Sequence, residues 1–181
     1  MVPIRSLNDD EIPEFAKLTL HSSHQVRFIE YMPFGEEGKW SRENFMSTDE
    51  VKRSVEQIAP LVPAKIRKSG PARYFRFEGA PGVVGFISPL SNHFCGKCNR
   101  LRLTPDGTLR PCLFADTEID LKPALRGGAP DREIERLIHL SIDAKPEGHS
   151  GNIMDLLADA GECGLTGFRD LGMRPMSRIG G

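Results

Sequence analysis

The sequence is short of cysteine, of excess charge and of long apolar runs, and each shortage excludes a class of protein. Four cysteines in 181 residues are too few for a disulfide scaffold, so we expect reduced thiols in a reducing compartment. A formal net charge of −1 excludes a chain that coats nucleic acid through overall basicity. No apolar run approaches the roughly 20 residues of a membrane span, and no signal-peptide pattern follows Met1. We therefore expect a cytoplasmic protein with no membrane or nucleic-acid partner.

Capping residues and hydrophobic periodicity predict a chain that mixes helices and strands. Ser47 opens a capping box ahead of a helix, and Pro105-Asp106-Gly107 is typical of a β-hairpin turn. Strand–helix alternation early in the chain gives way to antiparallel hairpins, which predicts an α/β fragment followed by an α+β module. The helices are expected near residues 10–20, 48–58, 121–125, 134–142 and 153–160, and the strands at 26–32, 74–77, 83–87, 101–104 and 108–110.

Three cysteines in the spacing C-x2-C-x13-C are the strongest chemical signal in the chain: Cys95, Cys98 and Cys112. Two thiolates from one tight turn can bind the same centre, and the predicted hairpin would bring the third back beside them. Structural zinc would need a fourth ligand, which His93 or Cys163 could supply. An iron–sulfur cluster held by three cysteines would instead leave one iron open to substrate. The spacing predicts a metal site and leaves zinc and iron–sulfur open.

Arginines alternate with leucines between those cysteines. Arg100 and Arg102 share one face of the predicted strand, so their guanidinium groups can converge on one phosphate or carboxylate. Arg27, in the strand at residues 26–32, is placed for a similar role. A solvated strand face is the alternative interpretation of such arginines, and the nearby thiolates favour the anion site.

Four stretches of the sequence, taken together, resemble one family. Residues 94–114 are the most specific of them, and the four span nearly the whole chain. The family is GTP 3′,8-cyclase, a radical S-adenosylmethionine enzyme of molybdenum cofactor biosynthesis. The stretches are residues 8–12, 26–33, 94–114 and 176–181.

The resemblance implies a lyase reaction and assigns residues to it. In the family, a three-cysteine [4Fe–4S] cluster meets the guanine of GTP, and another cluster cleaves S-adenosylmethionine. The resulting radical abstracts the ribose 3′ hydrogen, and C3′ then bonds to C8, which gives (8S)-3′,8-cyclo-7,8-dihydroguanosine 5′-triphosphate. The implied site residues are Cys95, Cys98 and Cys112 for the metal, Arg100, Arg102 and Arg27 for the substrate, Met32 for the cofactor, and Gly180 and Gly181 for catalysis.

One element of the family pattern is missing. The S-adenosylmethionine-cleaving cluster is bound in the family by C-x3-C-x2-C near the N-terminus, and this sequence has no such triplet. We therefore interpret residues 1–60 as the end of an incomplete TIM-type barrel. Residues 61–181 would form the cluster- and GTP-binding module with a Gly-Gly tail. The chain is expected to bind a cluster and GTP without generating the radical alone.

Partners and two rival functions follow from this interpretation. S-adenosylmethionine would bind only if a separately encoded N-terminal half, which carries the radical-generating cluster, were supplied. The other partner that we consider is a second copy of this chain, in a homodimer. One rival is a non-catalytic structural-zinc domain. The other is an inert remnant, in which the helix at 12–20 and the strand at 26–32 expose apolar faces.

Overall fold

The computed structural model describes residues 1–33, 40–66, 70–115 and 117–147, which divide between two compact units. The first unit contains Met1–Pro33 and Trp40–Phe94, and the second takes in the described residues from Cys95 onward. The predicted division of the chain at residue 60, between the end of a barrel and a cluster- and GTP-binding module, stays a prediction. Across the described ranges, no helix has the length and apolar character needed to cross a membrane.

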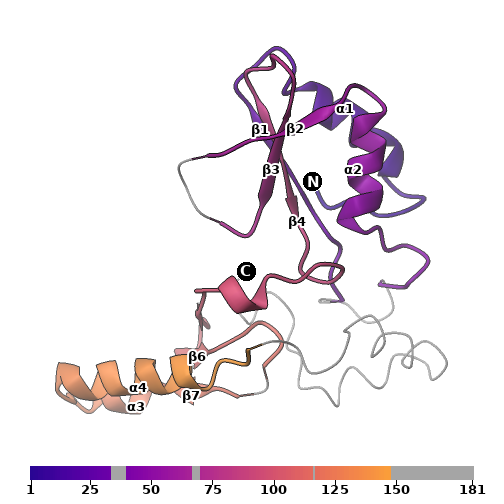
Figure 1. Cartoon of the computed structure of the whole chain (residues 1–181). Coiled ribbons are helices and arrows are strands. Elements are labelled where there is room, and N and C mark those ends of the chain that lie inside the picture. The colour runs from indigo at the N-terminus through magenta and orange to yellow at the C-terminus, as the bar shows by residue number, and fades with distance from the viewer. Residues whose placement is uncertain (34–39, 67–69, 116, 148–181) are drawn as a thin grey trace. The chain divides into compact units, whose positions relative to one another are not determined.

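The first unit is a mixed four-stranded sheet with two helices (Figure 1). Its strand order is β1-β4-β3-β2, in which β1 and β4 run parallel and the other pairs are antiparallel. The predicted helices and strands are present, although β1 ends three residues earlier than expected. The short strand β2 was not predicted. The elements are η1 Asp9–Glu11, α1 Ile12–Lys17, β1 Gln25–Ile29, α2 Thr48–Glu56, β2 Leu61–Pro63, β3 Arg73–Phe77 and β4 Val83–Ile87.

Strand alternation gives this sheet two different faces. One face packs against α1 and α2 and forms the core of the unit. The other face carries the side chains that alternate with the core residues, among them Arg27 of β1 and Tyr74 of β3. The fully buried core side chains include Ile12 and Ala16 of α1, Phe28 of β1, Val51 and Val55 of α2, Phe77 of β3, and Val84 and Phe86 of β4.

A buried carboxylate joins the end of β1 to two other segments. Glu30 is 2% exposed, and its oxygens accept hydrogen bonds from the backbone N–H groups of Thr48 (3.0 Å), Leu90 (2.8 Å) and Ser91 (3.0 Å). The Ser91 hydroxyl donates to it as well. A buried carboxylate is stabilised by such donors, so Glu30 fixes the start of α2 against the chain that follows β4.

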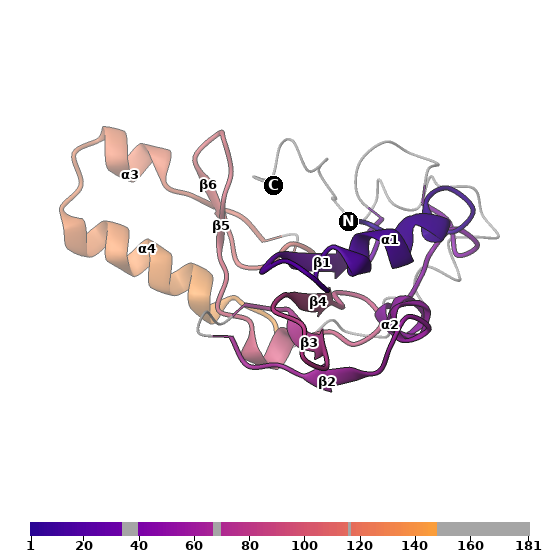
Figure 2. The ribbon, with the colours of Figure 1, turned by 90° about the horizontal axis from the view of Figure 1, so that it is seen from above.

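The second unit contains a three-stranded antiparallel sheet and two helices. The predicted hairpin is confirmed, as are the two helices after it, which lie side by side (Figure 2). The two-residue strand β7 was not predicted, and the helix expected at residues 153–160 lies outside the described residues. The elements are η2 Cys95–Lys97, β5 Arg102–Leu103, β6 Thr108–Arg110, β7 Ile119–Asp120, α3 Lys122–Arg126 and α4 Asp131–Asp143.

The hairpin turn depends on a threonine and a glycine. The hydroxyl of Thr104 donates to the carbonyl of Thr108 (2.9 Å) and accepts from its N–H group (2.9 Å). Gly107 has a φ of +79°, and a Cβ at this position would lie 2.7 Å from Cγ of Lys122. Both features favour glycine. The whole is a small α/β fold with one mixed and one antiparallel sheet, in agreement with the predicted α/β fragment.

Candidate metal centre

Cys95, Cys98 and Cys112 form no disulfide within the described part of the chain, and each is half-buried. Cys95 opens the single-turn η2, and the N–H group of Cys98 donates to the carbonyl of Cys95 at 3.0 Å. This bond closes the C-x2-C turn. Cys112 follows β6 directly after the buried Pro111. All three side chains are therefore partly accessible, as metal-binding cysteines must be.

A lysine two residues after the last residue of α4 forms hydrogen bonds with both ends of the hairpin that separates these cysteines. Nζ of Lys145 donates to the carbonyl of Arg100 at 2.6 Å and to the carbonyl of Pro111 at 3.0 Å. Arg100 lies two residues after Cys98, and Pro111 lies immediately before Cys112. One ammonium group thus bonds both cysteine-bearing segments. The sequence carried no signal of this contact, because Lys145 lies 34 and 45 residues from its partners.

The electrostatic environment of Arg102 includes two of the three cysteines and two arginines. Burial lowers the pKa of its guanidinium, Arg100 and Arg110 lower it further, and the Cys112 and Cys98 thiolates act in the opposite direction. Arg102 also pairs directly with Arg110 across β5 and β6. The predicted return of Cys112 toward Cys95 and Cys98 stays a prediction. Two neighbouring cations create a positive potential that an anion would relieve.

Arg110 is almost fully enclosed, with 2% of its surface exposed. Its Nη2 donates to the carbonyl of Ala115, and its Nε lies 3.5 Å from a carboxylate oxygen of Glu118. Nε and Nη1 are buried and have no hydrogen-bond acceptor among the residues that the structure describes. Buried donors without acceptors cost free energy unless another group satisfies them. The surroundings of Cys112 therefore fit an anionic group such as a thiolate-bound cluster.

Within the described residues, no three His, Cys, Asp or Glu side chains are grouped closely enough to hold one ion. Of the two proposed fourth ligands for zinc, His93 is exposed and Cys163 lies outside the described residues. The donor set of three thiols among arginines fits a multinuclear cluster, whose thiolates stand farther apart than those around one zinc ion.

The remaining predicted site residues lie in different parts of the chain. Arg27 and Met32 belong to the first unit, where the arginine is exposed and the methionine is half-buried just beyond β1. Arg100 is exposed and Arg102 half-buried in the second unit. Gly180 and Gly181 lie outside the described residues. The structure thus relates Arg102 to Cys98 and Cys112, and it describes Arg27 only within its own unit.

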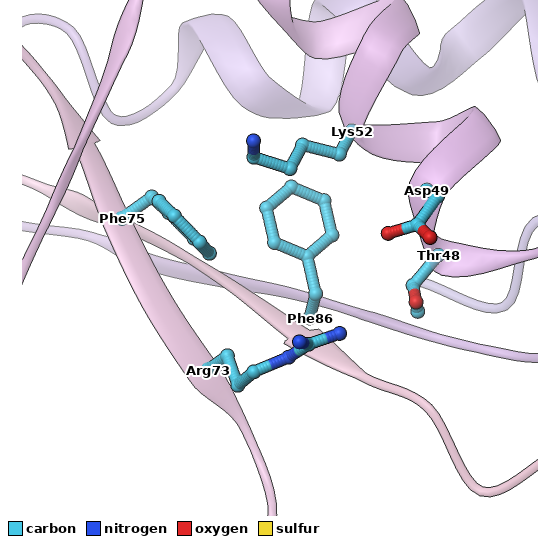
Figure 3. A pocket seen from close by; sticks show the side chains of 6 residues that line it. All are labelled: Thr48, Asp49, Lys52, Arg73, Phe75 and Phe86. Carbon is cyan, nitrogen blue, oxygen red and sulfur yellow. The ribbon is translucent and has the colours of Figure 1, made fainter. Parts of the chain in front are cut away.

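A small pocket between α2 and the sheet of the first unit was not predicted (Figure 3). Its volume is about 120 Å³, which is smaller than the roughly 300 Å³ at the lower end of the usual range for small-molecule binding pockets. Nζ of Lys52 lies 4.9 Å from the centre of the Phe75 ring on one of its walls. The size excludes this pocket as a nucleotide site. Its lining residues are Thr48, Asp49, Lys52, Arg73, Phe75 and Phe86.

Comparison with known proteins gives a consistent answer. The family model described as Molybdenum Cofactor Synthesis C matches residues 24–151. The GTP 3′,8-cyclase of Thermodesulfovibrio yellowstonii is 46% identical over 182 aligned residues, which cover 100% of this chain and 51% of that protein. The GTP 3′,8-cyclase of Syntrophomonas wolfei is 43% identical, with 100% and 52% covered. The chain belongs to the GTP 3′,8-cyclase family.

Membership in the GTP 3′,8-cyclase family extends over the whole chain but over only part of each relative. The GTP 3′,8-cyclase of Heliobacterium modesticaldum is 47% identical over 151 residues, 82% of this chain and 46% of that protein. The chain thus spans about half the length of the curated relatives it matches, in their C-terminal part.

Proposed function

We propose that this chain is the substrate-side part of a GTP 3′,8-cyclase, a lyase of molybdenum cofactor biosynthesis. In this proposal Cys95, Cys98 and Cys112 hold one [4Fe–4S] cluster, and Arg100 and Arg102 hold GTP beside it. The observation that carries the proposal is the arrangement around the hairpin. Thiols on both of its ends act on Arg102, and Lys145 bonds both ends.

The arginines account for an anionic substrate. A guanidinium group donates in a planar fork that matches a phosphate, and such charge-assisted bonds are about twice as strong as neutral ones. Arg102 is half-buried, which weakens competition from water. When bound, a cluster with three thiolate ligands offers one open iron as a coordination position for the guanine base. The chain itself supplies the binding and orientation of the nucleotide.

The first unit fits the end of a barrel. The parallel pairing of β1 with β4 is the arrangement that barrel strands require. The start of the chain continues this sheet: the N-terminal nitrogen of Met1 donates to the carbonyl of Arg27 (2.8 Å), and its carbonyl accepts from the N–H group of Ile29 (3.1 Å). Met1 therefore lies beside Phe28 as a residue of a further parallel strand would.

The exposed apolar side chains of the first unit support the proposal that a partner protein binds there. Leu7 before α1, Phe15 on it and Leu18 directly after it are 71%, 38% and 51% exposed. We propose that an N-terminal half, separately encoded, covers them and supplies the cluster that cleaves S-adenosylmethionine. Met32 would then contact S-adenosylmethionine, and Gly180 and Gly181 would reach the substrate. The free thiols suit a cytoplasmic location.

Anaerobic reconstitution with iron and sulfide tests the cluster. We expect about four irons per chain and a broad visible absorbance, because three thiolates and one open position suit a [4Fe–4S] centre. Replacing Cys112 by Ser should abolish the absorbance, whereas replacing Cys163 by Ser is the matched control and should leave it unchanged. A colourless protein that holds one zinc ion would contradict the proposal and establish the zinc-domain alternative.

A further inference from the structure

The second face of the sheet in the first unit contains a row of three residues in direct register. Arg27 of β1 lies opposite Gly85 of β4, and Gly85 lies opposite Tyr74 of β3. Neighbouring strands are about 4.8 Å apart, so a side chain at the middle position of such a row separates the outer two. Glycine has none. The Cζ atom of Arg27 consequently lies 5.7 Å from the centre of the Tyr74 ring, within cation–π range.

The space above Gly85 is needed for this contact. A Cβ at position 85 would lie 3.0 Å from Cε1 of Tyr74 and 3.3 Å from Cγ of Arg27. Both distances are tighter than ordinary contacts between carbon atoms. Any other residue at this position would therefore push the ring and the arginine apart.

Two groups fix the direction of the Arg27 side chain. Its Nη2 donates to Oε1 of Gln25 at 3.1 Å, and the ring of Tyr74 contacts its guanidinium. A freely rotating arginine side chain loses rotamer entropy when it is held in one conformation. Because a guanidinium donates from its edge, contact with a ring leaves its N–H groups available for an anion. Arg27 is exposed and so is accessible to one.

We propose that Tyr74 and Gly85 position Arg27 for a phosphate group of the nucleotide. This inference rests on the proposed function and on the substrate role that the family resemblance implies for Arg27. Tyr74 acts through Arg27, so it is a positioning residue. The ring contributes by preorganising the guanidinium before the nucleotide arrives, which raises affinity without a new contact to the ligand.

A double-mutant cycle on the reconstituted chain tests this, with GTP affinity measured by calorimetry. The variants are Arg27→Ala, Tyr74→Leu, the two combined, and Tyr74→Phe. A cation–π contact of the usual strength predicts that Tyr74→Leu weakens GTP binding about threefold to tenfold. Tyr74→Phe keeps the ring and should bind like the parent. In the Arg27→Ala background, Tyr74→Leu should have no further effect, because its action passes through the guanidinium.

The outcomes separate the two proposals. If Arg27→Ala leaves GTP affinity unchanged, the proposed nucleotide role of Arg27 fails, and the role of Tyr74 fails with it. If Arg27→Ala weakens binding but Tyr74→Leu has no effect, or has the same effect in both backgrounds, only the positioning role is overturned. Gly85→Ala provides a second route to the same test if Tyr74→Leu does not fold. It should lower affinity by a similar factor, and unchanged affinity in a folded Gly85→Ala protein would also overturn the positioning role.

Discussion

Arg102 keeps a positive charge in a half-buried position beside Arg110 and close to two thiols. Burial and the neighbouring arginines lower its pKa, while the Cys112 and Cys98 thiolates oppose them. Two cations opposite each other on neighbouring strands normally repel. The arrangement therefore favours the approach of an anionic group, either a thiolate-ligated cluster or a nucleotide.

Replacing Arg102 by Ala should weaken GTP binding by about tenfold to a hundredfold, since a charge-assisted hydrogen bond is worth roughly 1.5–3 kcal/mol. Arg100→Ala should have a similar effect. Calorimetry on the reconstituted protein provides the measurement. The control is Arg136→Ala on α4, an exposed arginine 2.8 Å from Glu133, which should bind GTP normally. Equal affinity in the Arg102 and Arg136 variants would remove the nucleotide assignment.

Helix α2 shows how a local sequence signal becomes structure. Ser47 caps its N-terminus, and Glu50 reaches back to the N–H group of Ser47 at 2.9 Å. Arg5 also donates to Glu50, at 2.6 Å. Burial acts to raise the pKa of Glu50, but the bonds from Ser47 and Arg5 outweigh it, so the pKa lies below its ordinary value of 4.5.

This shift predicts a pH dependence. A carboxylate with a lowered pKa stabilises the fold above the ordinary value of 4.5 and loses this contribution as the pH falls through the lowered value. Glu50→Gln should therefore cost about 1 kcal/mol of unfolding free energy at pH 7, and the difference from the parent should shrink below pH 4.5. Urea unfolding followed by circular dichroism measures it.

Asp49→Asn serves as the control for that experiment, because Asp49 shares the first turn of α2 but accepts no capping hydrogen bond among the described residues. A deficit of Glu50→Gln that stays constant down to acidic pH would contradict the role given to the capping box.

Elements defined by local signals were predictable, and those defined by distant contacts were not. The capping box of α2 and the Pro105-Asp106-Gly107 turn each lie within a few residues, so the sequence shows them directly. The strand Leu61–Pro63 exists because it pairs with β3, which its own three residues do not indicate.

The same distinction applies to the site. Cysteine spacing and the Arg100–Arg102 alternation are local patterns. The burial of Arg110 and the bonds of Lys145 depend on β6, α4 and the segment before Glu118 being packed together. Gly85 also gave no signal of its function, since its significance lies in residues on two other strands.

At the scale of the whole molecule, this chain corresponds to about half of its relatives. We expect the isolated chain, supplied with S-adenosylmethionine, reductant and GTP, to form neither 5′-deoxyadenosine nor cyclised nucleotide. Adding an N-terminal half that contains the C-x3-C-x2-C triplet should restore both products, measured by liquid chromatography. Cyclised product from the isolated chain would contradict the assignment.

A matched pair of variants locates the contact with that half. Leu18→Asp places a charge on the exposed apolar side of α1 and should reduce product formation at limiting partner concentration. Leu125→Asp is the control, because Leu125 is 57% exposed on α3, in the other unit. Equal losses in both variants would mean that the apolar side chains near α1 are not the contact surface.

The bonds of Lys145 have a consequence for the order of events during synthesis. Cys95, Cys98 and Cys112 leave the ribosome before Lys145, yet the ammonium group that joins the two ends of the hairpin is the last part of this arrangement to appear. Until residue 145 has been added, the two ends of the hairpin lack this shared bond. Loading of iron and sulfide is therefore expected to be a late step, and a nascent chain stopped before residue 145 should retain metal poorly.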